Sequence, residues 1–419
     1  GFDVDYDRII FSSEFRSLQD KTEVIRLSST DFVHTRLTHS LEVSVVARSL
    51  GRKVGVKILE KHPALAEVHG YKPNDFGSIV AAAALAHDIG NPPFGHSGEN
   101  AIGHFFKNGQ GKNFKSELTD KEYEDLCNFE GNANGFKILT QDLKGLLGGL
   151  RLSYATLGAF TKYPKQSLPK GTTDDVAYKK YGVFQSEVPM FKQISEELGL
   201  LNKNNISGDQ FSRHPLAYLV EAADDICYTI IDFEDGINLG VIEEDFALEY
   251  LIKLVKNNIQ TSKYNALPDK KARVSYLRAI AIGALIDDAV NIFIQNEEAL
   301  LQGNVRFALL EKSQYKAQMD DIIKLSIDRI YNSKEVIDKE LSGFEVINEL
   351  LLRYTNAINN CYEEKGSHYD ELILKLLPKR FDFKDGSLYT RLMGICSVIS
   401  SYSDSKAVLT YKKLKGLKF

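Results

Sequence analysis

The segment over residues 82–99 (AAALAHDIGNPPFGHSGE) constrains the fold of this chain more than any other stretch. Its alanine-rich first part contains no helix breaker, which predicts a buried helix that allows neighbouring elements to approach closely. The glycine and the two prolines that follow cannot continue a helix, so we expect the helix to end at His87 and Asp88. An imidazole and a carboxylate are therefore expected together at one end of a buried helix.

The side chains around this helix end are able to bind a metal ion. His87 offers a ring nitrogen and Asp88 a carboxylate oxygen, a mixed donor set that suits a transition metal, Mn²⁺ or Mg²⁺. A second histidine, His96, and a carboxylate, Glu99, follow the turn and are expected near the first turn of the next helix. An adjacent His-Asp pair also occurs by chance, and the alternative is a helix end where Asp88 only accepts local hydrogen bonds.

The length and composition of the chain are those of a soluble globular protein. Its 419 residues suffice for one large core or two domains, and 43% hydrophobic and 26% charged residues are ordinary values. A net charge of -5 gives no general attraction to nucleic acid or anionic membranes. Four scattered cysteines and the lack of an apolar run of about 18 residues predict a reduced, cytoplasmic chain without a membrane span. The chain begins with Gly1 and not Met, which leaves a preceding targeting segment open.

Few prolines and few alternating apolar runs predict a mostly helical protein. The expected amphipathic helices cover residues 2–26, 215–235, 243–256, 273–296, 313–331, 334–359 and 369–377. Two stretches rich in Gly, Lys, Thr and Pro, residues 108–120 and 163–182, are expected to be mobile insertions. The helices beyond residue 237 are expected to form a scaffold and an oligomer surface more than to supply catalytic residues.

The helix expected over residues 215–235 has an unusual polar face. At about 100° per residue, one narrow stripe carries five carboxylates, one tyrosine and no base: Glu221, Asp224, Asp225, Tyr228, Asp232 and Asp235. Such close like charges repel one another unless cations lie nearby, and a metal ion would neutralise part of that charge. The alternative is a solvent-facing acidic stripe, although such faces usually mix Lys with Glu.

Other polar residues become informative only if they converge on this site. Thr38 is expected to cap a helix with His39 in its first turn and Arg36 just outside, and a lone histidine there is more often structural. Lys162 and Tyr163 follow an apolar run, and Lys179 and Lys180 lie beyond a loop. Loop lysines are solvated by default. The segment NFEGNANG at residues 128–135 suits a turn that opens a helix.

A histidine, a His-Asp pair and a later aspartate on helices resemble the ligand pattern of the HD superfamily of metal-dependent phosphohydrolases. Within it, the chain closely resembles deoxynucleoside triphosphate triphosphohydrolases of the bacterial dGTPase type. The stretches that carry the resemblance, in the family's order within residues 7–235, are DRIIFSSEFRSLQDKTEV, TRLTHSLEV, HDIGNPPFGHSGE, NFEGNANG and EAADDICYTIIDFED. Beyond residue 240 the match is faint and lies around YTRLM at residues 389–393.

The resemblance implies an all-α, HD-domain helical fold with additional C-terminal helices. We expect one large helical domain over residues 1–419, with a catalytic core at about 7–240 and a scaffold or oligomer region at about 241–419.

Matching the family's motifs residue by residue gives each candidate site residue a role. The implied metal ligands are His39, His87, Asp88 and Asp224, with Asp225 as the alternative to Asp224. His96 and Glu99 match the catalytic histidine and its partner carboxylate. The implied substrate-binding residues are Arg36 near the α-phosphate, Lys162, Tyr163 and Lys180 (or Lys179) at the phosphates, Tyr228 and Asp232 at the sugar, and also Glu23, Val24, Asn128 and Arg391. Many relatives have Gln before Val where this chain has Glu23, a departure that bears on sugar contacts and base preference.

The implied activity is metal-dependent hydrolysis of dNTPs, dGTP and other dNTPs, to deoxynucleoside and inorganic triphosphate. The implied cofactor is Mn²⁺ or Mg²⁺, with other transition metals as alternatives. The implied partners are a dNTP substrate, a dNTP activator, further copies of the chain in a hexamer or tetramer, and single-stranded nucleic acid, but no membrane. Two other readings remain: another HD phosphohydrolase, such as a 5′-nucleotidase or phosphodiesterase, and a non-catalytic nucleotide-sensing or single-strand-binding protein.

Overall fold

The computed structural model describes residues 1–21, 34–143, 147–170, 174–200, 210–332, 334–379 and 386–417. These residues form helices and connecting loops without a named β-strand, and isolated bridges pair Lys165 with Gln210 and Gln166 with Val183. The predicted all-α class is confirmed. No helix in the described part of the chain is both long and apolar enough to span a membrane.

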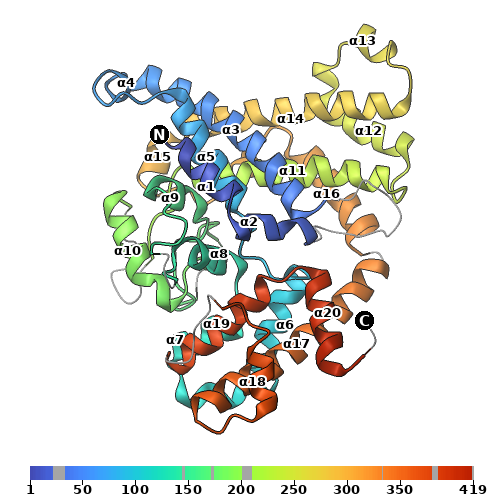
Figure 1. Cartoon of the computed structure of the whole chain (residues 1–419). Helices are drawn as coiled ribbons and strands as arrows, with labels where there is room; N and C mark the ends of the chain where they lie inside the picture. The colour runs from blue at the N-terminus through green and yellow to red at the C-terminus, as the bar shows by residue number, and fades with distance from the viewer. Residues whose placement is uncertain are drawn as a thin grey trace.

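The helices fall into an upper and a lower group in Figure 1. The helices up to residue 238 are α1 (Asp3–Ile10), α2 (Ser13–Arg16), η1 (Ser17–Asp20), α3 (Arg36–Lys61), α4 (Ala64–Glu67), α5 (Pro73–Ala86), α6 (His96–Lys107), η2 (Gln110–Glu117), α7 (Asp120–Cys127), α8 (Gly131–Thr140), α9 (Tyr154–Phe160), η3 (Gln185–Glu187), α10 (Val188–Glu197) and α11 (Ala217–Asn238). The remaining helices are α12 (Glu244–Val255), η4 (Lys256–Asn258), α13 (Thr261–Asn265), α14 (Lys270–Gln295), α15 (Glu297–Leu301), η5 (Leu309–Lys312), α16 (Lys316–Ser326), η6 (Ile327–Tyr331), α17 (Lys334–Tyr362), α18 (His368–Leu374), α19 (Leu388–Ser400) and α20 (Asp404–Lys415).

Helix α5 contacts α1, α3, α9 and α11 in the upper group and packs along α3 (Figure 1). Pro73 stands at the start of α5, and residues 81–86 have no solvent exposure. The two backbones approach closely at Gly51 of α3 because glycine has no side chain: a Cβ there would lie 2.6 Å from the carbonyl oxygen of Phe76. The helix ends at His87, its C-cap, as the sequence predicts.

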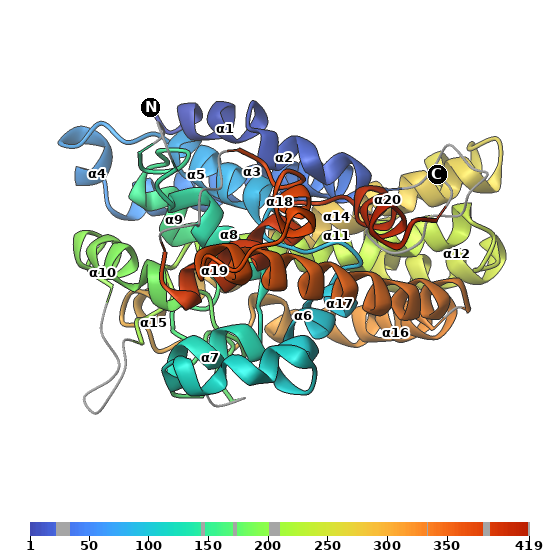
Figure 2. The same ribbon diagram turned by 60° about the horizontal axis from the view of Figure 1, so that its bottom comes forward.

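Two hydrophobic clusters build the molecule. The first joins α3, α5, α9 and α11 with α12, α14 and α16, while the second joins α6 and α7 with α17, α18, α19 and α20. Figure 2 shows α17 lying alongside α6 and α19, two of the helices that it contacts. Each cluster therefore contains residues from both sides of the boundary expected near residue 240. The loop from α5 to α6 connects the two clusters.

Some expected boundaries are wrong in detail. The single helix expected over residues 2–26 is broken, because α1 ends at Ile10 and the Ser12 hydroxyl accepts a hydrogen bond from Phe15 N to begin α2. Helix α3 starts at Arg36, capped by Thr35 and not by Thr38, whose hydroxyl completes the capping box. Residues 110–117, expected within a mobile insertion, form η2. Glu23 and Val24 lie outside the described residues.

Candidate active site

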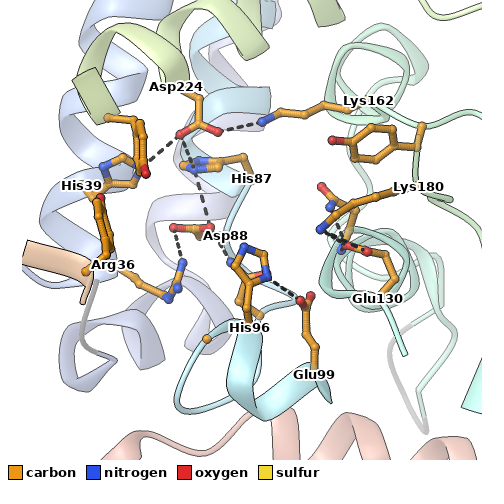
Figure 3. Close-up of a pocket in the computed structure, with 16 residues that line it drawn as sticks. Arg36, His39, His87, Asp88, His96, Glu99, Glu130, Lys162, Lys180 and Asp224 are labelled. Carbon is orange, nitrogen blue, oxygen red and sulfur yellow. Dashed lines mark hydrogen bonds and ion pairs between the residues drawn. The ribbon is translucent and has the colours of Figure 1, made fainter. Parts of the chain in front are cut away.

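A polar cavity opens where α3, α5, α6, α8 and α11 meet, and its volume is about 390 Å³ (Figure 3). Its lining consists of Arg36, His39, His87, Asp88, Asn91, Gly95, His96, Glu99, Glu130, Asn132, Lys162, Tyr163, Lys180, Asp224, Tyr228 and Tyr331. Most residues that the sequence analysis singled out, from Arg36 to Tyr228, therefore share one cavity.

Three of the four predicted metal ligands form a compact cluster. His39 comes from the start of α3, His87 from the end of α5 and Asp224 from the second turn of α11, and their donor atoms all lie within 4.8 Å of one another. Asp224 Oδ1 lies 3.2 Å from His39 Nε2 and 3.4 Å from His87 Nε2. Three elements distant in sequence thus direct nitrogen and oxygen donors at one point.

The surroundings of the cluster fit a divalent cation. His87 Nδ1 donates to the carbonyl oxygen of Ala84 at 2.6 Å, which leaves Nε2 to face the cluster. Asp88 Oδ1 lies at its edge, 3.6 Å from His87 Nε2. Asp88 Oδ2 is buried without a hydrogen bond, although Arg36 Nη1 lies 3.0 Å away. Asp88 therefore brings a second carboxylate to the edge of the cluster, and a set of imidazole nitrogens and carboxylate oxygens is one that a divalent metal ion would bind.

The acidic stripe of α11 separates into two environments at Asp224 and Asp225. Burial raises the pKa of Asp224, but the charges of Lys162 and His87 outweigh burial and hold the pKa well below its usual range. Lys162 Nζ lies 2.8 Å from Asp224 Oδ2. Burial, together with the charges of Glu221 and Asp224, raises the pKa of Asp225 to about 8. Asp225 lies outside the cluster, so the geometry favours Asp224 as the ligand.

His96 and Glu99 form a hydrogen-bonded pair at the mouth of the cavity (Figure 3). His96 Nδ1 lies 2.7 Å from Glu99 Oε2, and the backbone N–H of Gly131 donates to Glu99 Oε1 at 2.7 Å. The hydrogen bond with Glu99 raises the pKa of His96 above its ordinary value. The His96 side chain is 82% exposed, so a buried carboxylate orients an accessible imidazole.

The first glycine of the NFEGNANG segment, Gly131, allows this arrangement. A Cβ at Gly131 would lie 2.2 Å from Asn91 Oδ1 and 2.8 Å from Glu99 Oε1. The amide-rich segment therefore packs its backbone directly against the loop that carries the His-Asp pair, and Glu130 and Asn132 of the same segment line the cavity.

Two lysines lie across the cavity from His39 (Figure 3). Lys162 contacts Asp224, and Lys180 Nζ lies 3.3 Å from Glu130 Oε2. Burial lowers the pKa of Lys180, but Glu130 and Glu99 outweigh it and raise the pKa above its ordinary value. Lys179 instead lies 3.7 Å from Glu311 and does not line the cavity. Of the two lysines left open by the sequence, Lys180 is the one that lines the cavity.

An aromatic wall closes one side of the cavity. Tyr228 stacks on Tyr331, with ring centroids 5.6 Å apart and ring planes at 20°. The Tyr331 hydroxyl donates to Asp232 Oδ2 at 2.6 Å, so Asp232 is buried behind the wall and does not line the cavity. Tyr331 belongs to η6, in the region expected to be scaffold, and no motif marked it.

Two predicted substrate-binding residues lie away from the cavity. Asn128 is exposed at the end of α7, where its side-chain N–H donates to Glu124 Oε1 at 2.7 Å. Arg391 is buried in α19, donates from Nε to Asn359 Oδ1 at 3.0 Å and lies over the Tyr362 ring. Both residues contact the protein itself in the lower group of helices.

Comparison with known proteins shows the family to which the chain belongs. A model of the HD domain matches residues 36–133. A Synechocystis deoxyguanosinetriphosphate triphosphohydrolase-like protein is 37% identical over 99% of this chain and 93% of its own length, and a Pseudomonas aeruginosa protein of the same name gives the same values. The chain belongs to the deoxyguanosinetriphosphate triphosphohydrolase family. A Yersinia enterocolitica deoxyguanosinetriphosphate triphosphohydrolase is 32% identical over 84% of this chain and 76% of its own length.

Membership of this family accounts for the donor set. An HD domain implies a divalent metal, and the cluster of His39, His87 and Asp224 fits one. The segment of this chain that matches the HD domain contains His39, His87, Asp88, His96 and Glu99. Asp224 lies in α11, beyond the matched residues.

Proposed function

We propose that this chain is an enzyme that hydrolyses dNTPs, dGTP among them, to deoxynucleoside and inorganic triphosphate with the help of a divalent metal. One observation carries the proposal: a His-His-Asp cluster, an accessible His-Glu pair and several positively charged side chains line the same cavity of about 390 Å³. These are the three groups that cleavage at an α-phosphate needs: a metal site, a proton donor and partners for the triphosphate charge.

His39, His87 and Asp224, with Asp88 at the edge of the cluster, are the residues that would hold the metal. A nitrogen and oxygen donor set suits Mn²⁺, Mg²⁺ and other transition metals. A divalent metal in such a site supplies Lewis-acid activation of a phosphate oxygen and of water. Arg36 lies 3.0 Å from Asp88, and its permanent positive charge would lie beside the α-phosphate of a bound dNTP.

His96 is the proposed general acid. The net reaction breaks the bond between the α-phosphorus and the 5′-oxygen and forms a bond from a water oxygen to that phosphorus. Because Nδ1 faces Glu99, Nε2 is the nitrogen left to give a proton to the departing 5′-oxygen. Glu99 favours the charged imidazole and raises the pKa of His96, which keeps this proton available near neutral pH.

The remaining lining residues are assigned to substrate binding. Lys162 and Lys180 would pair with the triphosphate oxygens, and Tyr163 lies beside them in the lining. The stacked rings of Tyr228 and Tyr331 would lie against the deoxyribose, where a packed ring leaves no room for a 2′-hydroxyl. A dNTP activator, a hexamer or tetramer, nucleic-acid binding and a cytoplasmic location stay predictions of the family resemblance.

The test is product analysis of the purified chain incubated with each dNTP and either Mn²⁺ or Mg²⁺. We expect inorganic triphosphate and deoxynucleoside in equal amounts. Orthophosphate or a nucleoside monophosphate would instead indicate another HD phosphohydrolase. Nucleotide binding without any product, under either metal, would indicate a sensing or binding protein.

A further inference from the structure

The loop between α5 and α6 sets the distance between the metal site and the general acid. It covers residues 87–95, from the His-Asp pair to the residue before His96. Phe94 has a φ of 65°, in the left-handed region, which is unfavourable for a large side chain. Such a conformation persists only where the surrounding structure holds it. The contacts around this loop therefore bear on the geometry of the reaction.

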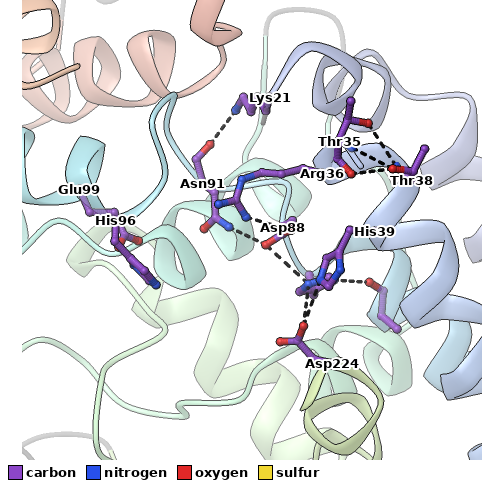
Figure 4. Close-up of polar contacts among 12 residues, drawn as sticks. Lys21, Thr35, Arg36, Thr38, His39, Asp88, Asn91, His96, Glu99 and Asp224 are labelled. Carbon is purple, nitrogen blue, oxygen red and sulfur yellow. Dashed lines mark hydrogen bonds and ion pairs between the residues drawn. The ribbon is translucent and has the colours of Figure 1, made fainter. Parts of the chain in front are cut away.

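A buried lysine contacts the middle of the loop. Lys21 Nζ donates to the carbonyl oxygen of Asn91 at 2.6 Å and to the carbonyl oxygen of Ser400, the last residue of α19, at 2.5 Å. The Asn91 side-chain N–H in turn donates to Asp88 Oδ1 at 2.5 Å (Figure 4). Lys21 thus connects α19 to the backbone of Asn91, and the side chain of Asn91 connects onward to the carboxylate of Asp88 beside the His-His-Asp cluster.

The strained residue Phe94 is held from α17 and α20. Its backbone N–H donates to Asp404 Oδ1 at 3.0 Å, and Asp404 Oδ2 lies 2.8 Å from Lys339 Nζ. Its ring lies against Gly343 of α17, where a Cβ would come within 2.5 Å of the Phe94 Cγ. Only glycine fits at this position without displacing the Phe94 ring.

A third contact reaches the start of the loop. Asn134 Nδ2 donates to the carbonyl oxygen of Gly90 at 2.9 Å, and Ser397 Oγ of α19 donates to Asn134 Oδ1 at 2.9 Å. Gly90, Asn91 and Phe94 are thus all fixed, directly or through one side chain, by the lower group of helices.

We propose that α17, α19 and α20 position the loop for catalysis, and that Lys21 and Gly343 are positioning residues of the reaction. The inference rests on the proposed function, because it concerns the spacing of Asp88 and His96. Neither Lys21 nor Gly343 lines the cavity, and the side chain of Lys21 and the backbone of Gly343 contact the loop at Asn91 and Phe94, so we expect their effect on turnover to act through the loop.

The first test replaces Gly343 with alanine. Gly343→Ala introduces the clash with Phe94, and Gly283→Ala is the matched control, because Gly283 lies within α14 and a Cβ there meets no atom within 4 Å. Both changes bring the same gain in helix propensity. We expect Gly343→Ala to lower kcat for dGTP about 10-fold to 100-fold with little change in KM, the cost of misplacing a reacting group by about 1 Å. Gly283→Ala should behave as the wild type.

The second test is independent of any clash. Lys21→Met keeps the aliphatic stem but removes the hydrogen bonds to Asn91 and Ser400, whereas Lys21→Arg keeps donors at the same place. We expect Lys21→Met to lower kcat as Gly343→Ala does and Lys21→Arg to recover part of the loss. Hydrogen exchange on the metal-free proteins should accelerate in the peptide over residues 88–98 for Lys21→Met and Gly343→Ala, while helices α12 and α14 stay unchanged.

The outcomes separate this inference from the proposed function. Suppose that the wild type is active. If Gly343→Ala and Lys21→Met then both keep a kcat within about twofold of wild type and show unchanged hydrogen exchange in the loop, the positioning role is overturned. Faster exchange throughout the protein, in proportion to a lower Tm, would mean that these residues are only structural and would also overturn it. If the wild type releases no triphosphate, the proposed function fails, and loop exchange alone still decides whether the lower helices hold the loop.

Discussion

Two neighbouring aspartates on α11 have opposite electrostatic environments. Asp224 faces His39, His87 and Lys162. Burial raises its pKa, but the charges of Lys162 and His87 and the hydrogen bond with His39 outweigh burial and hold the pKa well below the usual range. Asp225 has its pKa raised to about 8, first by burial and then by Glu221 and Asp224. A rotation of about 100° per residue around the helix is enough to move a carboxylate from the cluster to an anionic neighbourhood.

This difference predicts distinct effects of removing each carboxylate. Asp224→Ala and Asp88→Ala should abolish both metal content and turnover, because each removes an anionic oxygen at the metal site. Asp225→Ala should retain stoichiometric metal. Metal analysis of the purified variants by mass spectrometry, with activity on dGTP, checks this. Stoichiometric metal with normal activity in Asp88→Ala or Asp224→Ala would place the metal elsewhere.

The exposed imidazole of His96 predicts a chemical role without a role in metal binding. His96→Ala should keep the metal and lose about 10²-fold or more in kcat, the range for a general acid. Glu99→Gln should change kcat in the same direction but less, because a neutral amide still orients the ring. Steady-state kinetics with metal analysis measures both. A His96→Ala enzyme with wild-type kcat would remove His96 from the mechanism.

The aromatic wall predicts how the sugar is selected. Tyr228→Ala should narrow the ratio of kcat/KM for dNTPs over NTPs, because it removes the ring that would meet a 2′-oxygen, even as overall activity falls. The measurement compares matched pairs such as dGTP and GTP on folded variant protein. If Tyr228 only packs against Tyr331, stability and activity will fall while the preference for deoxyribose stays the same.

At the scale of elements, a buried carboxylate connects α7 with α19. Asp125 has no solvent exposure, and its Oδ2 accepts hydrogen bonds from Gln185 N at 2.8 Å and from the Tyr389 hydroxyl of α19 at 2.6 Å. Burial raises its pKa from 3.8 to about 7 although these hydrogen bonds oppose the rise. The folded protein therefore keeps this proton up to about pH 7, whereas the unfolded chain releases it near pH 4.

The raised pKa predicts a loss of stability with rising pH. The folded state binds one proton more than the unfolded chain between these two pKa values. The protonated Asp125 therefore contributes its full stabilisation to the free energy of unfolding below about pH 4. This contribution falls as pH rises and is gone above about pH 7, a change of about 4 kcal/mol. Asp125→Asn stays neutral in both states, so its free energy of unfolding relative to wild type should rise between pH 5 and pH 8. Urea unfolding at both pH values measures this, with the exposed Asp120→Asn of α7 as control. An equal difference at both pH values would contradict the raised pKa.

At the scale of the whole molecule, the metal cluster connects α3, α5 and α11. A ligand that binds only the folded state stabilises it, by about 2.7 kcal/mol at a free concentration 100-fold above its Kd. We expect chelation to abolish turnover and lower the Tm, and added Mn²⁺ to restore both. Thermal unfolding across a metal titration checks this, and the same titration of Asp224→Ala should be flat. A metal-independent Tm in the wild type would argue against this cluster as the site.

The sequence alone determined features that depend on local chemistry. The alanine run, the glycine and the prolines decide where α5 ends, because backbone sterics act within a few residues, so His87 and Asp88 were predictable at a buried helix end. Helical phase likewise put Asp224 and Tyr228 on one face of α11. The family motifs carried the roles of His39, His96 and Glu99, and the structure brings those three residues to one cavity.

The tertiary structure decided what depends on contacts distant in sequence. Tyr331 meets Tyr228 across more than 100 residues, and Lys21 reaches Ser400 across 379 positions. Lys180, and not Lys179, lines the cavity because of how its loop packs, while Arg391 contacts Asn359 far from the site. Such pairings leave no periodicity in the chain, since they arise only when two packed surfaces meet. The helix propensity of the residues determines structure only within each helix. Packing against the rest of the molecule determines which side chains line the cavity.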